Sequence, residues 1–159
     1  MLSEIMFQAL NEQFTKERQN EAIYRSNSDA LKNIAWDGFA AFCAKQADGE
    51  AQHARLFANY LIDAGYAPVY SALDAVLDVA HTPLGVFSML LTLEHQTTSQ
   101  IKTLYYLAES QEDPQTCVFL HPLLIEQVEE EKLLADAVTE LTRATDNASL
   151  LLLDARYGS

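Results

Sequence analysis

Four glutamates and one histidine occupy positions where a helical protein would normally bury apolar side chains. The glutamates are Glu17, Glu50, Glu94 and Glu130, and His53 follows the second of them by one helical turn. Each glutamate interrupts an apolar stripe that has the alternating four- and three-residue spacing of a helix-bundle core. Carboxylates gathered in a dry interior must be protonated or neutralised by cations. Because oxygen ligands with one imidazole suit iron or manganese, these residues predict a metal centre.

The four glutamates are predicted to lie at one height in the bundle. Glu17 and Glu50 are almost equally distant from the first predicted turn, and Glu94 and Glu130 are almost equally distant from the second. At a rise of ~1.5 Å per residue the mismatches amount to only a few ångströms. Bridging carboxylates at this height can hold two metal ions close together, which is the geometry of a two-metal reaction.

Each residue taken alone also has a purely structural interpretation. His53 is compatible with a satisfied core or surface histidine, Gln127 with a core amide, and Tyr24 with a packing residue whose hydroxyl is hydrogen-bonded. Glu126 and Glu129 lie beside the stripe, in an acidic run that by itself would indicate a solvated face. The coincidence of four helices at one height favours the metal centre over these alternatives.

Sparse glycine and proline define the elements that position these residues. Thr82-Pro83 and Asp113-Pro114 each read as an N-cap followed by proline at the first helical position, and Ser3 is a plausible first cap. Four long helices are therefore predicted, over residues 4–31, 37–64, 83–110 and 114–143. A short apolar helix is expected near 147–155. Pro122 lies inside the last long helix and should kink it or delay its regular start.

The lengths of the connections predict the topology. Short links join the first helix to the second and the third to the fourth, which makes two antiparallel hairpins. The 17 residues of the link 66–82 could reach about 56 Å when extended, and a helix of this size is about 42 Å long. The link can therefore span the bundle and make the second and third helices parallel. The prediction is an all-α four-helix bundle over 4–143, with one long crossover and a short fifth C-terminal helix, in a single domain over 1–159.

The charge balance excludes some functions. The chain has 10 Lys and Arg against 23 Asp and Glu, for a formal net charge of −13. This balance argues against nucleic acid as a partner and favours cations, although acidity can also serve solubility alone. Cys43 and Cys117 are far apart and form no CxxC motif, which predicts a reduced, cytoplasmic chain. Neither a signal sequence nor a membrane-spanning stretch is evident, so no membrane partner is expected.

The full set of polar residues resembles the ferroxidase signature of ferritins, and is most similar to the non-haem prokaryotic ferritins. The similarity rests on Glu17 with Tyr24, the ExxH motif from Glu50 to His53, Glu94, and the run from Glu126 to Glu130, together with the crossover and the terminal helix. The resemblance implies that Glu17, Glu50 and His53 hold one iron ion. It implies that Glu50 and Glu94 hold a second, with Glu130 as a further candidate ligand.

The resemblance also implies roles for neighbouring residues and for the assembly. Gln127 would bind water or dioxygen beside the site, and Tyr24 would hydrogen-bond a ligand and could supply an electron. Two Fe(II) would be oxidised by dioxygen, and the product would be stored as a ferric mineral inside a homo-oligomeric, twenty-four-subunit cage. No haem is expected, because the haem-ligating methionine of bacterioferritins would fall at Gln52 and their second ExxH would need histidine where this chain has Glu130.

Three departures from the family pattern affect iron handling. Many prokaryotic ferritins have a carboxylate at position 49 that joins Glu126, Glu129 and Glu130 in a third iron site, and here the residue is Gly49. Glu21, one turn after Glu17, replaces a small residue and would be either an extra or transient ligand or a plain exposed glutamate. The acidic three-fold channel of animal ferritins would map to positions 118 and 121, which are valine and histidine. A route through the bundle wall is the expected replacement.

Two other functions fit the same residues. One is a peroxide-reducing di-iron bundle protein, although a rubrerythrin would normally add a Cys₄ site that two cysteines cannot supply. The other is a metal-binding shell subunit with weak or no catalysis.

Overall fold

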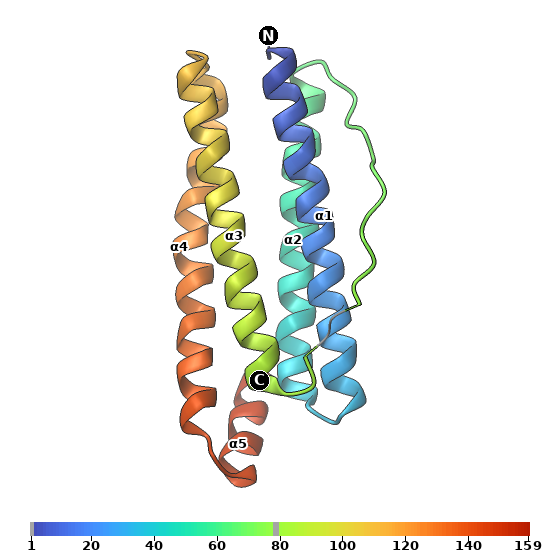
Figure 1. The fold of residues 1–159 in the computed structure, drawn as a ribbon, viewed down its shortest axis with the longest axis vertical. Helices are drawn as coiled ribbons and strands as arrows, with labels where there is room; N and C mark the ends of the chain where they lie inside the picture. Colours follow the sequence, from blue (N-terminus) through green and yellow to red (C-terminus); the bar gives the residue numbers. More distant parts are fainter. Residues whose placement is uncertain (1, 78–79) are drawn as a thin grey trace.

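Helices make up the whole of the regular structure in the computed structural model, which describes residues 2–77 and 80–159. Two antiparallel hairpins, α1 with α2 and α3 with α4, lie side by side, and α5 sits at one end of the bundle (Figure 1). The all-α, four-helix architecture with a short fifth helix is as predicted. The helices are α1 Glu4–Asn33, α2 Asp37–Asp63, α3 Pro83–Ser110, α4 Pro114–Arg143 and α5 Asn147–Tyr157.

Side-chain caps explain where the helices begin. Ser3, Thr82, Asp113 and Asp146 precede α1, α3, α4 and α5, and each accepts a hydrogen bond from the backbone N–H three residues later. Such caps satisfy donors that the first turn of a helix leaves unpaired. The boundaries therefore fall within two residues of those predicted from the sequence.

Pro122 does not delay α4, contrary to one of the two outcomes expected from the sequence. The helix begins at Pro114 and runs through Pro122 to Arg143. Proline removes one backbone hydrogen bond from a helix interior. Leu120 and Leu123 on either side of it are buried in the core, and this packing holds the helix together across the missing bond.

The crossover link is fastened along α1. Asn11 exchanges two hydrogen bonds with the backbone of Val69, at 3.1 and 2.7 Å, and Gln19 does the same with Asp74, at 3.0 and 2.9 Å. Figure 1 shows the link running along the outside of α1, so that α3 starts at the end where α2 also starts. Helices α2 and α3 therefore run parallel, and this sets Glu50 and Glu94 at matching heights.

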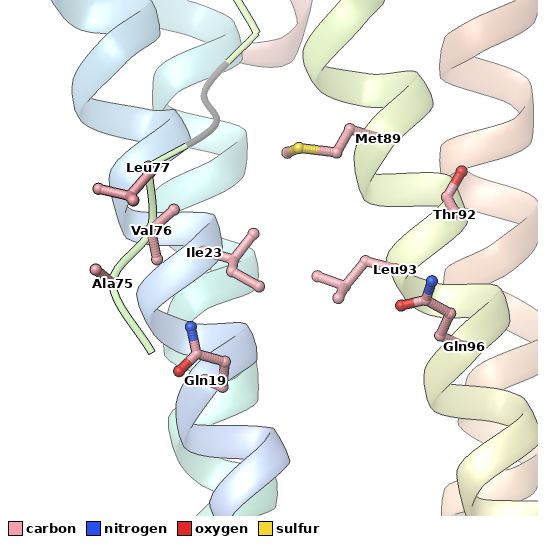
Figure 2. Close-up of a pocket in the computed structure, with 9 residues that line it drawn as sticks. All are labelled: Gln19, Ile23, Ala75, Val76, Leu77, Met89, Thr92, Leu93 and Gln96. Atoms are coloured by element: carbon pink, nitrogen blue, oxygen red, sulfur yellow. The ribbon is translucent and has the colours of Figure 1, made fainter. Parts of the chain in front are cut away.

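A cavity of about 480 Å³ lies where the link, α1 and α3 face one another (Figure 2). Ile23, Val76, Met89 and Leu93 are among its lining residues. The described residues that line it carry no ionisable side chain, so this cavity is not a metal centre.

Helix α5 packs on the start of α2. The backbone N–H of Phe39 donates to Asp154 Oδ1 at 2.8 Å, which caps α2 where Trp36, a donor-only side chain, cannot. A Cβ at Gly38 would lie 1.7 Å from the carbonyl oxygen of Asp154, so only glycine permits this approach. The ring of Tyr157 packs against that of Phe39, with the two ring centroids 5.4 Å apart, and covers one end of the core.

The core is divided into two apolar clusters with a polar layer between them. One cluster includes Leu10 and Phe57 near one end, and the other includes Phe39 and Phe87 near the other end. The buried polar residues of the middle layer include Glu17, Asn20, Glu50, Glu94, Thr97 and Gln127.

In the part of the chain that the structure describes, no helix is both long enough and apolar enough to cross a lipid bilayer.

Candidate metal centre

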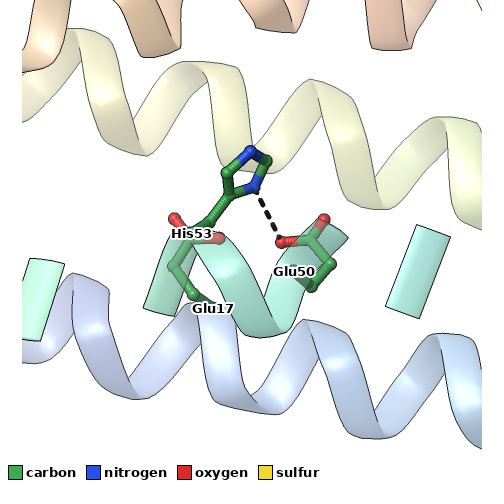
Figure 3. A group of neighbouring side chains, drawn as sticks. All are labelled: Glu17, Glu50 and His53. Atoms are coloured by element: carbon green, nitrogen blue, oxygen red, sulfur yellow. Dashed lines mark hydrogen bonds and ion pairs between the residues drawn. The ribbon is translucent and has the colours of Figure 1, made fainter. Parts of the chain in front are cut away.

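Three side chains form the tightest group of potential metal ligands. Glu17 comes from α1, and Glu50 and His53 come from α2, where they are one turn apart (Figure 3). One ligand atom from each lies within 4.8 Å of the other two. Glu17 is 1 % exposed and Glu50 is 5 % exposed. Two carboxylates and an imidazole thus meet in an interior from which water is largely excluded.

Among the described residues, only one of the two carboxylate oxygens of Glu17 has a hydrogen-bond donor. Its Oε1 accepts a hydrogen bond from Gln13 Nε2 at 2.7 Å, whereas its Oε2 is buried and has no hydrogen-bond partner among the described residues. Burial, followed by the negative charge of Glu50, raises the pKa of Glu17 well above its ordinary value. An unpaired carboxylate oxygen in such a place favours a proton or a cation.

Glu17, Glu50, Glu94 and Glu130 form an acidic layer across the middle of the bundle, and Glu50 interacts with the other three. Burial, followed by the negative charge of Glu94, raises the pKa of Glu50 to about 8. Its Oε2 lies 3.4 Å from His53 Nδ1. At neutral pH the metal-free layer therefore retains protons on carboxyl groups that a divalent ion would displace.

Glu94 on α3 is held by two donors. The hydroxyl of Tyr24 donates to Oε1 at 2.5 Å, and Gln127 Nε2 donates to Oε2 at 3.0 Å. Burial, followed by the charge of Glu94, raises the pKa of the Tyr24 phenol well above its ordinary value, so the phenol stays protonated and able to donate. These bonds fix the position of the Glu94 carboxylate.

Glu130 and Glu126, both on α4, make the remaining contacts of the layer, and helical spacing in the sequence predicts neither contact. Glu130 is half-buried, and its Oε2 accepts from Gln46 Nε2 at 2.5 Å. Burial is the main cause that raises the pKa of Glu130. Glu126 Oε2 lies 3.2 Å from His53 Nε2, so both ring nitrogens of His53 face carboxylates. A carboxylate on the outer nitrogen is the usual way to orient a metal-binding histidine.

A family model for ferritin-like domains matches residues 7–144, a span that contains every side chain of this layer. The chain belongs to the ferritin family. It is 32 % identical to a bacterial non-heme ferritin of Bacteroides fragilis over 158 residues, which covers 99 % of both chains. It is 31 % identical to a bacterial non-heme ferritin of Staphylococcus epidermidis over 153 residues, covering 96 % of this chain and 92 % of that one.

Solved ferritin structures have the same fold. An open-pore ferritin from the archaeon Archaeoglobus fulgidus aligns with a TM-score of 0.96 at 28 % identity, covering 99 % of this chain and 98 % of that one. An engineered closed form of that ferritin aligns with a TM-score of 0.97 at 29 % identity, covering 99 % and 97 %.

Other acidic residues of this ferritin lie apart from the tight group. Glu21 is half-buried and lies 3.6 Å from Arg25, one turn further along α1. Glu129 is exposed on α4. A Cβ at Gly49 would meet nothing within 4 Å, so the position beside Glu50 opens onto free space. Position 49 therefore supplies no carboxylate to the residues proposed for a third iron site, and one of those residues, Glu126, contacts His53 on α2 instead.

Proposed function

We propose that this ferritin is a ferroxidase that oxidises Fe(II) with dioxygen at a di-iron centre inside each subunit and stores the product as a ferric mineral. The observation that carries the proposal is the unpaired, buried Oε2 of Glu17 next to Glu50 and His53. A buried carboxylate without a donor is costly unless a proton or a cation neutralises it, and a divalent cation can neutralise several carboxylates at once. Carboxylates with a single imidazole are suited to iron.

Each side chain of the layer has a role in this proposal. Glu17, Glu50 and His53 bind the first iron ion, and Glu50 bridges to the second. Glu94 binds the second iron, with Glu130 as a further ligand. These assignments are supported by the burial of the three inner glutamates and by the charge coupling between Glu50 and Glu94.

The remaining polar side chains orient the ligands. Tyr24 and Gln127 hold Glu94 through its two oxygens, so this carboxylate is preorganised before iron arrives. In this proposal Gln127 also binds water or dioxygen beside the site, and Tyr24, whose hydroxyl donates to Glu94 Oε1 at 2.5 Å, supplies an electron. Glu126 holds the His53 ring through the nitrogen that faces away from Glu50.

Iron is the substrate of the reaction. Each of two Fe(II) ions gives up one electron, and dioxygen takes up both electrons together with two protons to become hydrogen peroxide. The two ions must be close together for the electrons to be delivered to one dioxygen molecule. A single layer that holds two sites satisfies this requirement.

We further propose that the subunits form a closed twenty-four-subunit cage in the cytoplasm. The assembly is supported by the ferritin fold and by α5, whose Leu151 and Leu152 are 59 % and 75 % exposed and therefore available to neighbouring copies. A net charge of −13 favours the concentration of iron inside. Cys43 and Cys117 are unpaired, as suits a reducing compartment. Size-exclusion chromatography measures the assembly directly.

An anaerobic Fe(II) titration followed by a pulse of oxygen tests the ferroxidase. We expect about two rapidly oxidised iron ions per chain, and we expect Glu94→Ala to abolish the rapid phase. Glu109→Ala, on an exposed part of α3, is the matched control and should retain it. Slow oxidation that Glu94→Ala leaves unchanged would instead identify a passive metal-binding shell.

A further inference from the structure

A row of hydrogen-bonded side chains leads from the metal centre to the surface between α3 and α4. Gln127 Nε2, which donates to Glu94 Oε2, also lies 3.2 Å from Thr98 Oγ1. The Thr98 hydroxyl in turn donates to Glu131 Oε1 at 2.5 Å. Gln127 is buried, whereas Thr98 and Glu131 are half-buried. Contiguous polar groups therefore connect Glu94 to the outside through one wall of the bundle.

The outer end of the row carries a second metal-binding side chain. His95 Nε2 lies 3.7 Å from Glu131 Oε2, and the side chains of His95 and Glu131 are 57 % and 31 % exposed. A cavity of about 280 Å³ opens beside Glu131, with Thr98 and Tyr105 also among its lining residues. A hydrated ion can therefore reach the Thr98 hydroxyl from solvent.

We propose that His95, Glu131 and Thr98 capture a divalent metal ion and pass it beyond Gln127 to Glu94. This inference rests on the proposed ferroxidase function, because it assigns a supply route to that centre. An imidazole, a carboxylate and a hydroxyl form a donor set that Fe(II) accepts. An ion held at about 2.1 Å from each of two atoms can bridge the 3.7 Å between His95 Nε2 and Glu131 Oε2 without movement of either helix.

The charges around the row favour inward transfer. Glu131 supplies the only carboxylate among the side chains of the row outside Glu94, so an ion leaves it for a centre that has several. Thr98 and Gln127 are uncharged and cannot trap the ion between the two ends. Lys102 also lines the cavity and opposes capture, so its removal should act in the opposite direction to loss of Glu131.

Positions 118 and 121, to which the acidic three-fold channel of animal ferritins would map, carry no carboxylate in this chain. Val118 is 73 % exposed and His121 is also exposed, and both lie in the first part of α4. Neither side chain can attract a divalent ion as an acidic channel does. The α3–α4 wall therefore offers a continuous polar path where the channel positions do not.

Stopped-flow oxidation of limiting Fe(II) by the assembled protein tests the capture site. We expect His95→Ala combined with Glu131→Gln to slow the rapid phase about tenfold, as loss of electrostatic guidance does, while the number of rapidly oxidised ions is retained. Lys102→Gln should speed this phase. The matched control, His121→Ala combined with Glu109→Gln, should oxidise iron at the wild-type rate.

Two outcomes of the kinetic test would overturn the capture site. One is a double variant that oxidises iron as fast as its control, and the other is loss of the rapidly oxidised ions themselves, which would make Glu131 part of the centre. Absence of a rapid phase in the wild-type protein would refute the ferroxidase and is therefore distinguishable from both.

A crystal soaked with Zn(II) alone provides a readout that does not depend on oxidation. Anomalous diffraction should show a zinc ion between His95 and Glu131, and this ion should be lost in the His95→Ala variant while zinc at Glu17 and Glu50 remains. Zinc at the inner residues with none at His95 would overturn the proposal.

Discussion

Glu50→Gln is expected to remove a pH dependence of stability that the metal-free protein shows. Burial and the charge of Glu94 raise the pKa of Glu50 from 4.5 to about 8. The unfolded chain releases this proton near the ordinary value, whereas the folded chain keeps it until about pH 8. The contribution of this group is therefore complete below the unfolded pKa and is lost as the pH rises through the folded one. At about 1.4 kcal/mol per pH unit, the loss is on the order of 5 kcal/mol.

Denaturation of the chelator-treated protein at about pH 5 and about pH 8 measures this effect. Relative to Glu50→Gln, the wild-type protein should lose stability at the higher pH, and saturating Co(II) should restore it, because the metal replaces the proton. Glu109→Gln, an exposed substitution, should follow the wild-type curve. Parallel curves for the wild type and Glu50→Gln would show that the carboxylate is not held in a dry acidic layer, and the reasoning would fail.

Two further substitutions test other parts of the structure. Glu126→Gln should weaken binding of Co(II) about tenfold or more, since it removes the charged partner of His53; calorimetric titration beside Glu109→Gln measures this, and equal affinities would exclude the role given to Glu126. Gly38→Ala should displace α5 from its packing against α2, because the new Cβ would lie 1.7 Å from the carbonyl oxygen of Asp154. Hydrogen exchange in α5 should then accelerate, and unchanged protection would contradict the docking described above.

Helix boundaries and the position of each glutamate along its helix were predictable, because capping and helical rise are local rules. Thr82 and Asp113 carry cap oxygens immediately before prolines, and each caps its helix as expected. The long link lets α2 and α3 run parallel, which follows from its length alone. Helical rise then places Glu50 and Glu94 near one level, where the charge of one raises the pKa of the other.

Contacts between side chains of different helices were not predictable in this way. A helical period defines the face of a residue, but not its rotamer or its partner across the bundle. The pairing of Glu126 with His53 and of Gln46 with Glu130 depends on both. The docking of Asp154 on α2 also depends on tertiary packing.

Anomalous diffraction from a crystal soaked anaerobically in Fe(II) tests the metal centre most directly. We expect two iron ions a few ångströms apart, one contacted by Glu17, Glu50 and His53 and the other by Glu50 and Glu94. An interior without iron, or iron bound only to exposed carboxylates, would contradict the proposal that the buried acidic layer binds the substrate.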